Sequence, residues 1–430
     1  MVLFVGYLLI HLKVEDNKFN WTVLGSMLVI FFLIALIWIK IVPNNQISDF
    51  GNFWLRAPGI FKGDKLYYTD NDYFAKYAYQ TGFMIYILGI IKVFGYNVFI
   101  MQFLNIIYQT VTLLLVYLIT NRIFHNIRAA RLSVFLLMIN LDWFALNSQA
   151  DNQYLGSMFY LLTIYLLMKN KMWSYILAGF TLTGGCLIRP IGPVFIAGII
   201  VYALIFILLR KKDYRTAIKY LLTLVIYLCL FLLVGIGVKS SGLNNYGLSN
   251  HDPGWKFLTG LSYQSGGTYS PDMDKFTDPK QSLSQTKHIE KKQLHKEISY
   301  LNESHSWIKL FLNKTQTLWA SRTQATDFSQ FNKIHSSNSN DLVNYIAYCG
   351  TVSLIIFSWI GSIMLIKIKF SNKLYILLLP LMAFAIVQLF IEVQGRYRIE
   401  FLPIISILAG VGFYYSISTS KVDSSSPSLK

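Results

Sequence analysis

The sequence predicts an all-α, polytopic membrane protein. Hydrophobic residues make up 54% of the 430 residues and charged residues only 14%, and the mean hydropathy is +0.46. Soluble domains carry roughly 25% charged residues. The apolar residues gather in long runs of about 20 residues, the length of an α-helix that crosses a bilayer. Most lysines and arginines fall in the short turns between those runs, where they orient a protein in the membrane.

We predict a bundle of about ten transmembrane helices, with helices at the outer interface and one long extracytoplasmic loop. The first run, Met1 to Leu12, is too short to span, and it lacks the basic leader and cleavage site of a signal peptide. It is either a shortened helix or an interfacial segment. The predicted spans are about 21–42, 98–120, 132–148, 152–169, 172–188, 192–210, 218–238, 343–366, 374–393 and 400–418.

The basic residues predict the orientation. Those in the short turns and near the termini lie on one side, which is cytoplasmic by the positive-inside rule. Both termini are therefore predicted to be cytoplasmic. These residues are Lys13, Lys18, Arg122, Arg128, Arg131, Lys169, Lys171, Arg210, Lys211, Lys212, Arg215, Lys219, Lys367, Lys369, Lys373 and Lys421.

Three units follow from this order. We predict an N-terminal transmembrane module over 1–238 with a catalytic first outer loop at 43–97, an extracytoplasmic loop over 239–342, and C-terminal transmembrane helices with a short tail over 343–430. The segment Tyr79 to Gly95 is predicted as an amphipathic interfacial helix, because a further span there would invert all later turns. Within the long loop, helices are predicted over 287–300 and 307–319.

Charge and cysteine content exclude other classes. The formal net charge is +17, but the basic residues follow the topology, so no nucleic-acid partner is expected. The three cysteines, Cys186, Cys229 and Cys349, lie in or beside apolar runs and give neither a disulfide framework nor metal-ligand spacing.

Asp49 is the first candidate for chemistry. It lies about two turns beyond the first span, among aromatic residues of the membrane interface that include Phe50 and Trp54. A fixed acid at this boundary suits a substrate with a lipid tail and a polar head group, and Trp54 beside it is a candidate substrate-binding residue. The alternative is a solvated acid at the end of a helix.

Two further segments on the same side carry unusual charges. Arg189-Pro190 breaks an apolar stretch, and an arginine there is well placed to bind a lipid phosphate through two N–H groups. The turn 392–400 is either a self-satisfied cluster of ion pairs or a head-group site. Its candidate substrate-binding residues are Glu392, Arg396, Tyr397 and Arg398.

Two aspartates flank the outer end of the third predicted span. Asp142 lies inside the apolar run, so it needs a partner or a wet cavity. Asp142 or Asp151 can bind a sugar hydroxyl or help to position a divalent metal ion, and metal dependence stays open.

These motifs together resemble membrane glycosyltransferases of the GT-C fold. The similarity is to the bacterial, Gram-positive branch related to protein O-mannosyltransferases and to aminoarabinose and arabinosyl transferases. It is carried by Ser48-Asp49 with Trp54 and Ala57, by the run Tyr73 to Gly82, by Arg189-Pro190 and by Gln394-Gly395-Arg396-Tyr397-Arg398. The chain departs from the family at Ala78, where the family has proline, and at Phe50, where many relatives carry a second acid.

The resemblance implies a mechanism. A polyprenyl-phosphate sugar is the donor at the outer face, and Asp49 is the general base that takes the proton of an acceptor hydroxyl. The sugar is transferred with inversion. Arg189, Arg396 and Arg398 hold the departing phosphate. The acceptor is a cell-wall glycopolymer, a lipid or a protein.

Two other functions remain open. One is a transporter or flippase of a lipid-linked solute, although transporters more often show matching halves with helices broken at mid-membrane. The other is a polysaccharide polymerase or ligase, which uses similar donors.

Overall fold

The computed structural model describes residues 2–249, 252, 254–276 and 282–418, and every regular element in this part of the chain is helical. The α-helices are α1 (Val2–His11), α2 (Asn17–Ile41), α3 (Ser48–Phe61), α4 (Tyr73–Lys76), α5 (Thr81–Phe94), α6 (Val98–Phe124), α7 (Ile127–Met138), α8 (Gln153–Met168), α9 (Met172–Ile188), α10 (Gly192–Tyr202), α11 (Tyr214–Ser240), α12 (Gly254–Leu261), α13 (Leu283–Glu303), α14 (Trp307–Ala320), α15 (Gln324–Asp327), α16 (Ser337–Met364), α17 (Tyr375–Phe390) and α18 (Leu402–Ser418). Short 3₁₀ turns η1 (Ala78–Gln80), η2 (Leu141–Phe144), η4 (Pro271–Phe276), η5 (Phe331–Lys333), η6 (Asn372–Leu374) and η7 (Gly395–Glu400) join them, and a π-helix η3 (Ala203–Leu209) extends α10.

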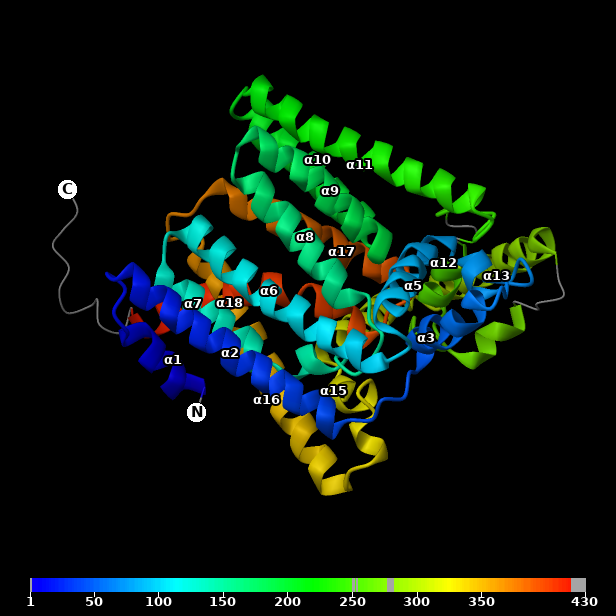
Figure 1. Ribbon diagram of the computed structural model, residues 1–430, viewed down its shortest axis with the longest axis horizontal. Helices are drawn as coiled ribbons and strands as arrows, with labels where there is room; N and C mark the ends of the chain where they lie inside the picture. The colour runs from blue at the N-terminus through cyan, green and yellow to red at the C-terminus, as the bar shows by residue number, and fades with distance from the viewer. Residues whose placement is uncertain (1, 250–251, 253, 277–281, 419–430) are drawn as a thin grey trace.

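The bundle is built around α18, the last helix of the chain. Every residue from Leu402 to Phe413 is buried, which is expected of a helix that is apolar on all sides. It packs against α16, α7 and α6, while α8, α9 and α11 form a second row and α10 packs on α17 (Figure 1). The core therefore contains helices from both ends of the chain.

The prediction of a polytopic helical membrane protein is confirmed. Within the described residues, six helices are long and apolar enough to cross a membrane: Asn17–Ile41, Val98–Phe124, Gly192–Leu209, Tyr214–Ser240, Ser337–Met364 and Asn372–Phe390. Three further predicted spans are the shorter apolar helices α8, α9 and α18.

The predicted span at 132–148 is wrong in its boundaries and its form. Helix α7 begins at Ile127 and ends at Met138, and the chain continues through the single turn η2. The number of apolar residues suggests a span here, but these residues are apolar because the irregular segment is itself buried. Asp142, in the middle of η2, forms an ion pair with Arg398 instead of continuing a helix.

Within the predicted segment Met1 to Leu12, residues 2–11 form the short helix α1, and Met1 lies outside the described residues. Helix α1 packs against α7 and α18. The carbonyl oxygen of Lys13 then accepts a hydrogen bond from Arg131 Nη2 at 2.9 Å. This segment is therefore a short helix.

The basic turns lie together at one end of the bundle. Arg122, in the last turn of α6, and Lys373, in η6, both donate to the carbonyl oxygen of Met168. The backbone N–H of Ser371 donates to Ile123 O at 3.0 Å. Lys421 lies outside the described residues. Figure 1 shows α1 at this end, with α3, α5, α12 and α13 at the opposite end.

The helices predicted within the segments 43–97 and 239–342 are confirmed. Helix α5 covers the interfacial segment, and α13 and α14 cover the two helices predicted in the long loop. Helix α5 packs on α3, α6 and α9, and it ends before Gly95, whose φ of 80° suits glycine.

The separation of charges predicts the result of cysteine labelling. We expect Ser284→Cys in α13 to react with an impermeant thiol reagent in intact cells, and Arg215→Cys in α11 to react only after lysis. The background lacks Cys186, Cys229 and Cys349. Labelling of Arg215→Cys, with none at Ser284→Cys, in intact cells would reverse the proposed orientation.

Candidate active site

A cavity of about 890 Å³ lies where the first outer segment meets the long loop. One wall is polar and comes from α3, α4, α12 and residues 391–397. Apolar lining comes from Ile191 in the α9–α10 turn, Phe231 of α11 and Phe384 of α17. Because α11 and α17 are candidate membrane spans, part of the cavity lining comes from helices that are apolar enough to cross a membrane.

Asp49 lies in the first turn of α3 and lines this cavity. The chain enters the helix through Ser48, whose φ of 52° is in the left-handed region. Two glutamines fix the approach: Gln149 Oε1 accepts the N–H of Ile47 at 3.1 Å, and Gln46 Nε2 donates to Ser148 O at 2.9 Å. The segment before α3 is thus anchored to the turn at 147–150.

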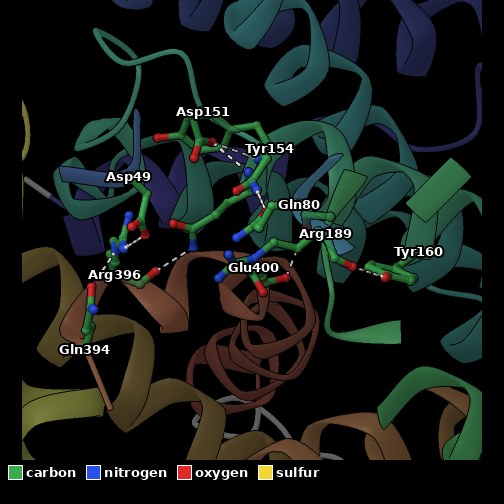
Figure 2. A network of polar contacts seen from close by, with 12 residues as sticks. Asp49, Gln80, Asp151, Tyr154, Tyr160, Arg189, Gln394, Arg396 and Glu400 are labelled. Atoms are coloured by element: carbon green, nitrogen blue, oxygen red, sulfur yellow. Dashed lines mark hydrogen bonds and ion pairs between the residues drawn. The ribbon is translucent and has the colours of Figure 1, made fainter. Parts of the chain in front are cut away.

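Arg396 holds the Asp49 carboxylate. Its Nη2 donates to Asp49 Oδ2 at 2.6 Å, and its Nε donates to Gln394 at 2.7 Å (Figure 2). The guanidinium lies over the ring of Phe50 at 5.0 Å and is itself buried. About 34% of the Asp49 side chain stays exposed, and this exposure is toward the cavity. The ion pair therefore orients the carboxylate without closing it off.

The pKa of Asp49 follows from this pairing. Burial raises the pKa, but the charge and hydrogen bond of Arg396, together with the charges of Lys256 and Arg189, lower it by more, so the pKa lies below the usual value of an aspartate. The group is ionised at neutral pH and available to accept a proton, although it is a weaker base than an unpaired carboxylate.

Arg189 also lines the cavity, at the end of α9. Its Nε is paired with the buried Glu400, and its guanidinium lies 5.5 Å from the ring centre of Tyr397. Its own carbonyl accepts the hydroxyl of Tyr160 at 2.6 Å (Figure 2). Gly156 of α8 permits this position, because a Cβ there would lie 2.6 Å from Arg189 Cβ. The helix break thus positions the arginine beside the cavity.

Glu392 and Tyr397 line the same cavity, together with a lysine that the sequence analysis missed. Lys256 of α12 donates from Nζ to Glu392 Oε2 at 2.5 Å, and its carbonyl accepts the N–H of Glu392 at 2.9 Å. Burial lowers the pKa of Lys256, but Tyr397 and Glu392 raise it by more, so the ammonium is held charged. No sequence feature separates Lys256 from the other lysines of the long loop.

Lys76 is a second missed cation. It lines the cavity and contacts Asp252 at 3.2 Å and Glu290 at 3.4 Å, and its Nζ lies 3.9 Å from the ring centre of Trp255. All four residues are buried. Lys76 therefore connects the segment 43–97 to the long loop. In the sequence, only its position within a run of aromatic residues could have marked it as a candidate.

Four predicted substrate-binding residues do not line the cavity: Arg396, described above, and Arg398, Asp151 and Trp54. Arg398 is 1% exposed and is paired with Asp142 at 2.5 Å, deep in the bundle. Asp151 is also buried, and its Oδ2 accepts the N–H groups of Gln153 and Tyr154 at the start of α8. Burial raises the pKa of Asp151 to about 7. The ring of Trp54 stacks on Tyr96 at 4.6 Å. Arg398, Asp151 and Trp54 therefore make contacts within the protein rather than at the cavity.

The donor set does not fit a double-acid metal site. Within the described residues, no three histidine, cysteine, aspartate or glutamate side chains lie close enough to hold a metal ion. The position after Asp49 is Phe50, whose buried ring contacts Arg396 rather than offering a carboxylate. The divalent ion left open by the sequence gains no support here, and we derive no step through one.

Comparison with known proteins gives one family match. A family model described as dolichyl-phosphate-mannose-protein mannosyltransferase matches residues 82–236. No curated protein sequence matches the chain.

Two solved structures are similar at low identity. One is the archaeal oligosaccharyltransferase AglB from Archaeoglobus fulgidus in complex with an inhibitory peptide and a dolichol-phosphate, with 13% identity, a TM-score of 0.43, and coverage of 95% of this chain and 52% of that chain. This chain thus spans about half the length of AglB. The other is ArnT from Cupriavidus metallidurans bound to undecaprenyl phosphate, with 11% identity, a TM-score of 0.41, and coverage of 91% and 78%.

The family match includes one of the sequence motifs. Residues 82–236 contain the Arg189-Pro190 break, while Asp49 and the 392–400 turn lie outside the matched segment. The match supports a membrane glycosyltransferase of the GT-C fold.

Proposed function

We propose that the protein transfers a sugar from a polyprenyl-phosphate-linked donor to a hydroxyl of an extracytoplasmic acceptor, with inversion at the anomeric carbon. One observation carries this proposal. Asp49, Arg189 and Lys256 face one cavity whose wall changes from polar to apolar. A lipid-linked sugar phosphate also changes from polar to apolar along its length, from the sugar through the anionic phosphate to the apolar chain.

The reaction places Asp49 at the acceptor. The acceptor oxygen attacks the anomeric carbon from the side opposite the phosphate, and its proton passes to the Asp49 carboxylate. The bond between the anomeric carbon and the phosphate oxygen breaks, and its electron pair leaves with the phosphate. Because the pKa of Asp49 lies below its usual value, we propose that proton transfer is late and that departure of the phosphate leads.

Arg189 and Lys256 stabilise the phosphate in this proposal. Each is already paired with a carboxylate, Glu400 or Glu392, that fixes its position before the donor binds. Preorganised cations of this kind need little rearrangement as negative charge develops on the leaving group. Arg396 acts on Asp49 rather than on the phosphate, because its Nη2 and Nε are already bound to Asp49 and Gln394.

The proposal also covers the orientation of the protein in the membrane and its branch of the family. We propose that the cavity opens on the extracytoplasmic face, that both termini are cytoplasmic, and that the chain belongs to the bacterial, Gram-positive branch. The grouping of the basic turns at the end opposite the cavity supports the first two. The motifs around Asp49 support the third.

A binding measurement on Lys256 tests this function. We expect Lys256→Gln to weaken polyprenyl-phosphate binding to the purified protein by roughly 10- to 100-fold, because a charge-assisted hydrogen bond contributes about 1.5–3 kcal/mol. Lys256→Arg should keep much of the affinity. Native mass spectrometry reads the bound lipid.

The matched control is Lys309→Gln, which removes an exposed lysine of α14 outside the cavity. It should bind the lipid as the wild type does. Thermal unfolding of both variants checks that Glu392, left without its lysine, does not unfold the site. Wild-type affinity in a folded Lys256→Gln protein would remove Lys256 from the phosphate site.

A further inference from the structure

Helix α13 has two chemically different faces. One face is turned into the protein, where Glu290 pairs with Lys76 and Thr286 Oγ1 accepts from Asn71 at 3.2 Å. Leu301 is buried on the same side. The other face is exposed over its whole length and carries six basic residues: Lys287, His288, Lys291, Lys292, His295 and Lys296.

Carboxylates are nearly excluded from the exposed face. Helix α13 contains three glutamates, and the structure describes all of its residues. Glu290 is buried, and Glu297 is half-buried and accepts from Gln293 at 3.0 Å. Only Glu303, the last residue of the helix, is exposed. The lysines therefore lack ion-pair partners within their own helix face, which leaves their charge available to another molecule.

The position of α13 separates this face from the membrane. Helix α14 packs on the candidate span α17, and Phe311 contacts Phe390 at the end of α17. Its exposed side chains include the apolar Ile308 and Leu312. Helix α13 packs on α12 and η4, and Figure 1 shows it at the end of the molecule opposite α1. Helix α14 thus packs directly on a candidate span, whereas the main contacts of α13 are with α12 and η4.

We propose that the exposed face of α13 binds an acceptor that is a linear polyanion. This inference rests on the proposed function and names the chemistry of its acceptor. The basic residues form two parallel rows with steps of four residues, which places one basic side chain about every 6 Å along each row, and two of the three in each row are lysines. A flexible chain with regularly spaced phosphate or carboxylate groups can match such rows.

The same helix connects the docking face to the cavity. Its opposite face contacts Lys76, which lines the cavity wall, so a polymer on the outer face lies about one helix diameter, roughly 10 Å, from that wall. One part of a long acceptor can occupy α13 while a neighbouring unit presents its hydroxyl to Asp49. A small acceptor cannot bridge this distance.

The test measures polyanion binding without any donor. The full-length protein in discs of neutral phospholipid is titrated with fluorescently labelled inorganic polyphosphate. We expect the quadruple variant Lys287→Gln, Lys291→Gln, Lys292→Gln and Lys296→Gln to bind roughly tenfold or more weakly, because four weak exposed ion pairs are lost together. Added salt should weaken the wild type more than the variant.

The matched control removes the same charge from exposed lysines elsewhere in the predicted outer segments: Lys62, Lys65, Lys239 and Lys333. It should bind polyphosphate as the wild type does, and a quadruple lysine-to-arginine variant of the α13 face should also retain binding. Equal weakening by the two glutamine quadruples would overturn the proposal in favour of nonspecific charge.

A second arm distinguishes a polymer from a lipid surface. If anionic phospholipid in the disc abolishes polyphosphate binding, the face belongs to the membrane and the proposal is wrong. These assays use neither donor nor catalysis. Loss of transfer in an Asp49 variant leaves their result unchanged, and a failed docking surface leaves the proposed transfer reaction intact.

Discussion

Asp49→Asn is expected to lower sugar transfer by roughly 10²–10⁴-fold. Asparagine keeps the size of the side chain and can still accept a hydrogen bond from Arg396, so the local structure should persist. It cannot take a proton from an acceptor hydroxyl at neutral pH. The measurement is the transfer rate of the protein reconstituted with a polyprenyl-phosphate sugar, at matched protein amounts.

Two comparisons make this result specific. Asp49→Glu should retain little activity, because one added methylene displaces the carboxylate by about an ångström from Arg396 and from the acceptor. Lipid-phosphate binding should stay close to wild type in Asp49→Asn, since Arg189 and Lys256 are unchanged. Near wild-type transfer by Asp49→Asn would reduce Asp49 to an acid at the start of a helix.

Arg398→Ala is expected to destabilise the protein by about 3–5 kcal/mol. The ion pair with Asp142 is buried on both sides, and Arg398 Nη2 also donates to Ser321 O at 2.9 Å. Truncation leaves the Asp142 carboxylate buried with Thr351 as its remaining side-chain donor. Thermal and denaturant unfolding of the purified protein measure the loss.

A double variant separates this structural role from a role in binding. Asp142→Leu with Arg398→Met removes both charges and fills the space with apolar atoms, so it should be less destabilised than Arg398→Ala. Both proteins, where folded, should bind polyprenyl phosphate as the wild type does. A normally stable Arg398→Ala protein that no longer binds the lipid would place Arg398 in the donor site after all.

The long helices could be predicted from the sequence because membrane spans are set by length and hydrophobicity, which are local properties. Helices α2, α6, α11 and α16 all lie where their apolar runs place them. The segment at 132–148 shows the limit of this argument. Its apolar residues are buried by other helices, and the backbone turns at η2 where Asp142 meets a partner 256 residues later in the chain.

The candidate site could be predicted in part for a similar reason. Polar residues near the ends of spans are few, and burying them requires a partner or a function. Four of those predicted on this basis line the cavity: Asp49, Arg189, Glu392 and Tyr397. The partners of Arg396 and Arg398 could not be predicted, since neighbouring arginines in one turn point to different carboxylates. Lys256 and Lys76 come from segments whose contacts depend on how the long loop folds back.

A cryo-electron microscopy structure of the protein with polyprenyl phosphate tests the central claim most directly. The account predicts the phosphate within hydrogen-bonding distance of Arg189 and Lys256, and the isoprenoid chain against Phe231 and Phe384 between α11 and α17. The Asp49 carboxylate should remain on Arg396, facing the position of the sugar. A phosphate bound outside this cavity, with Asp49 remote from it, would contradict the account.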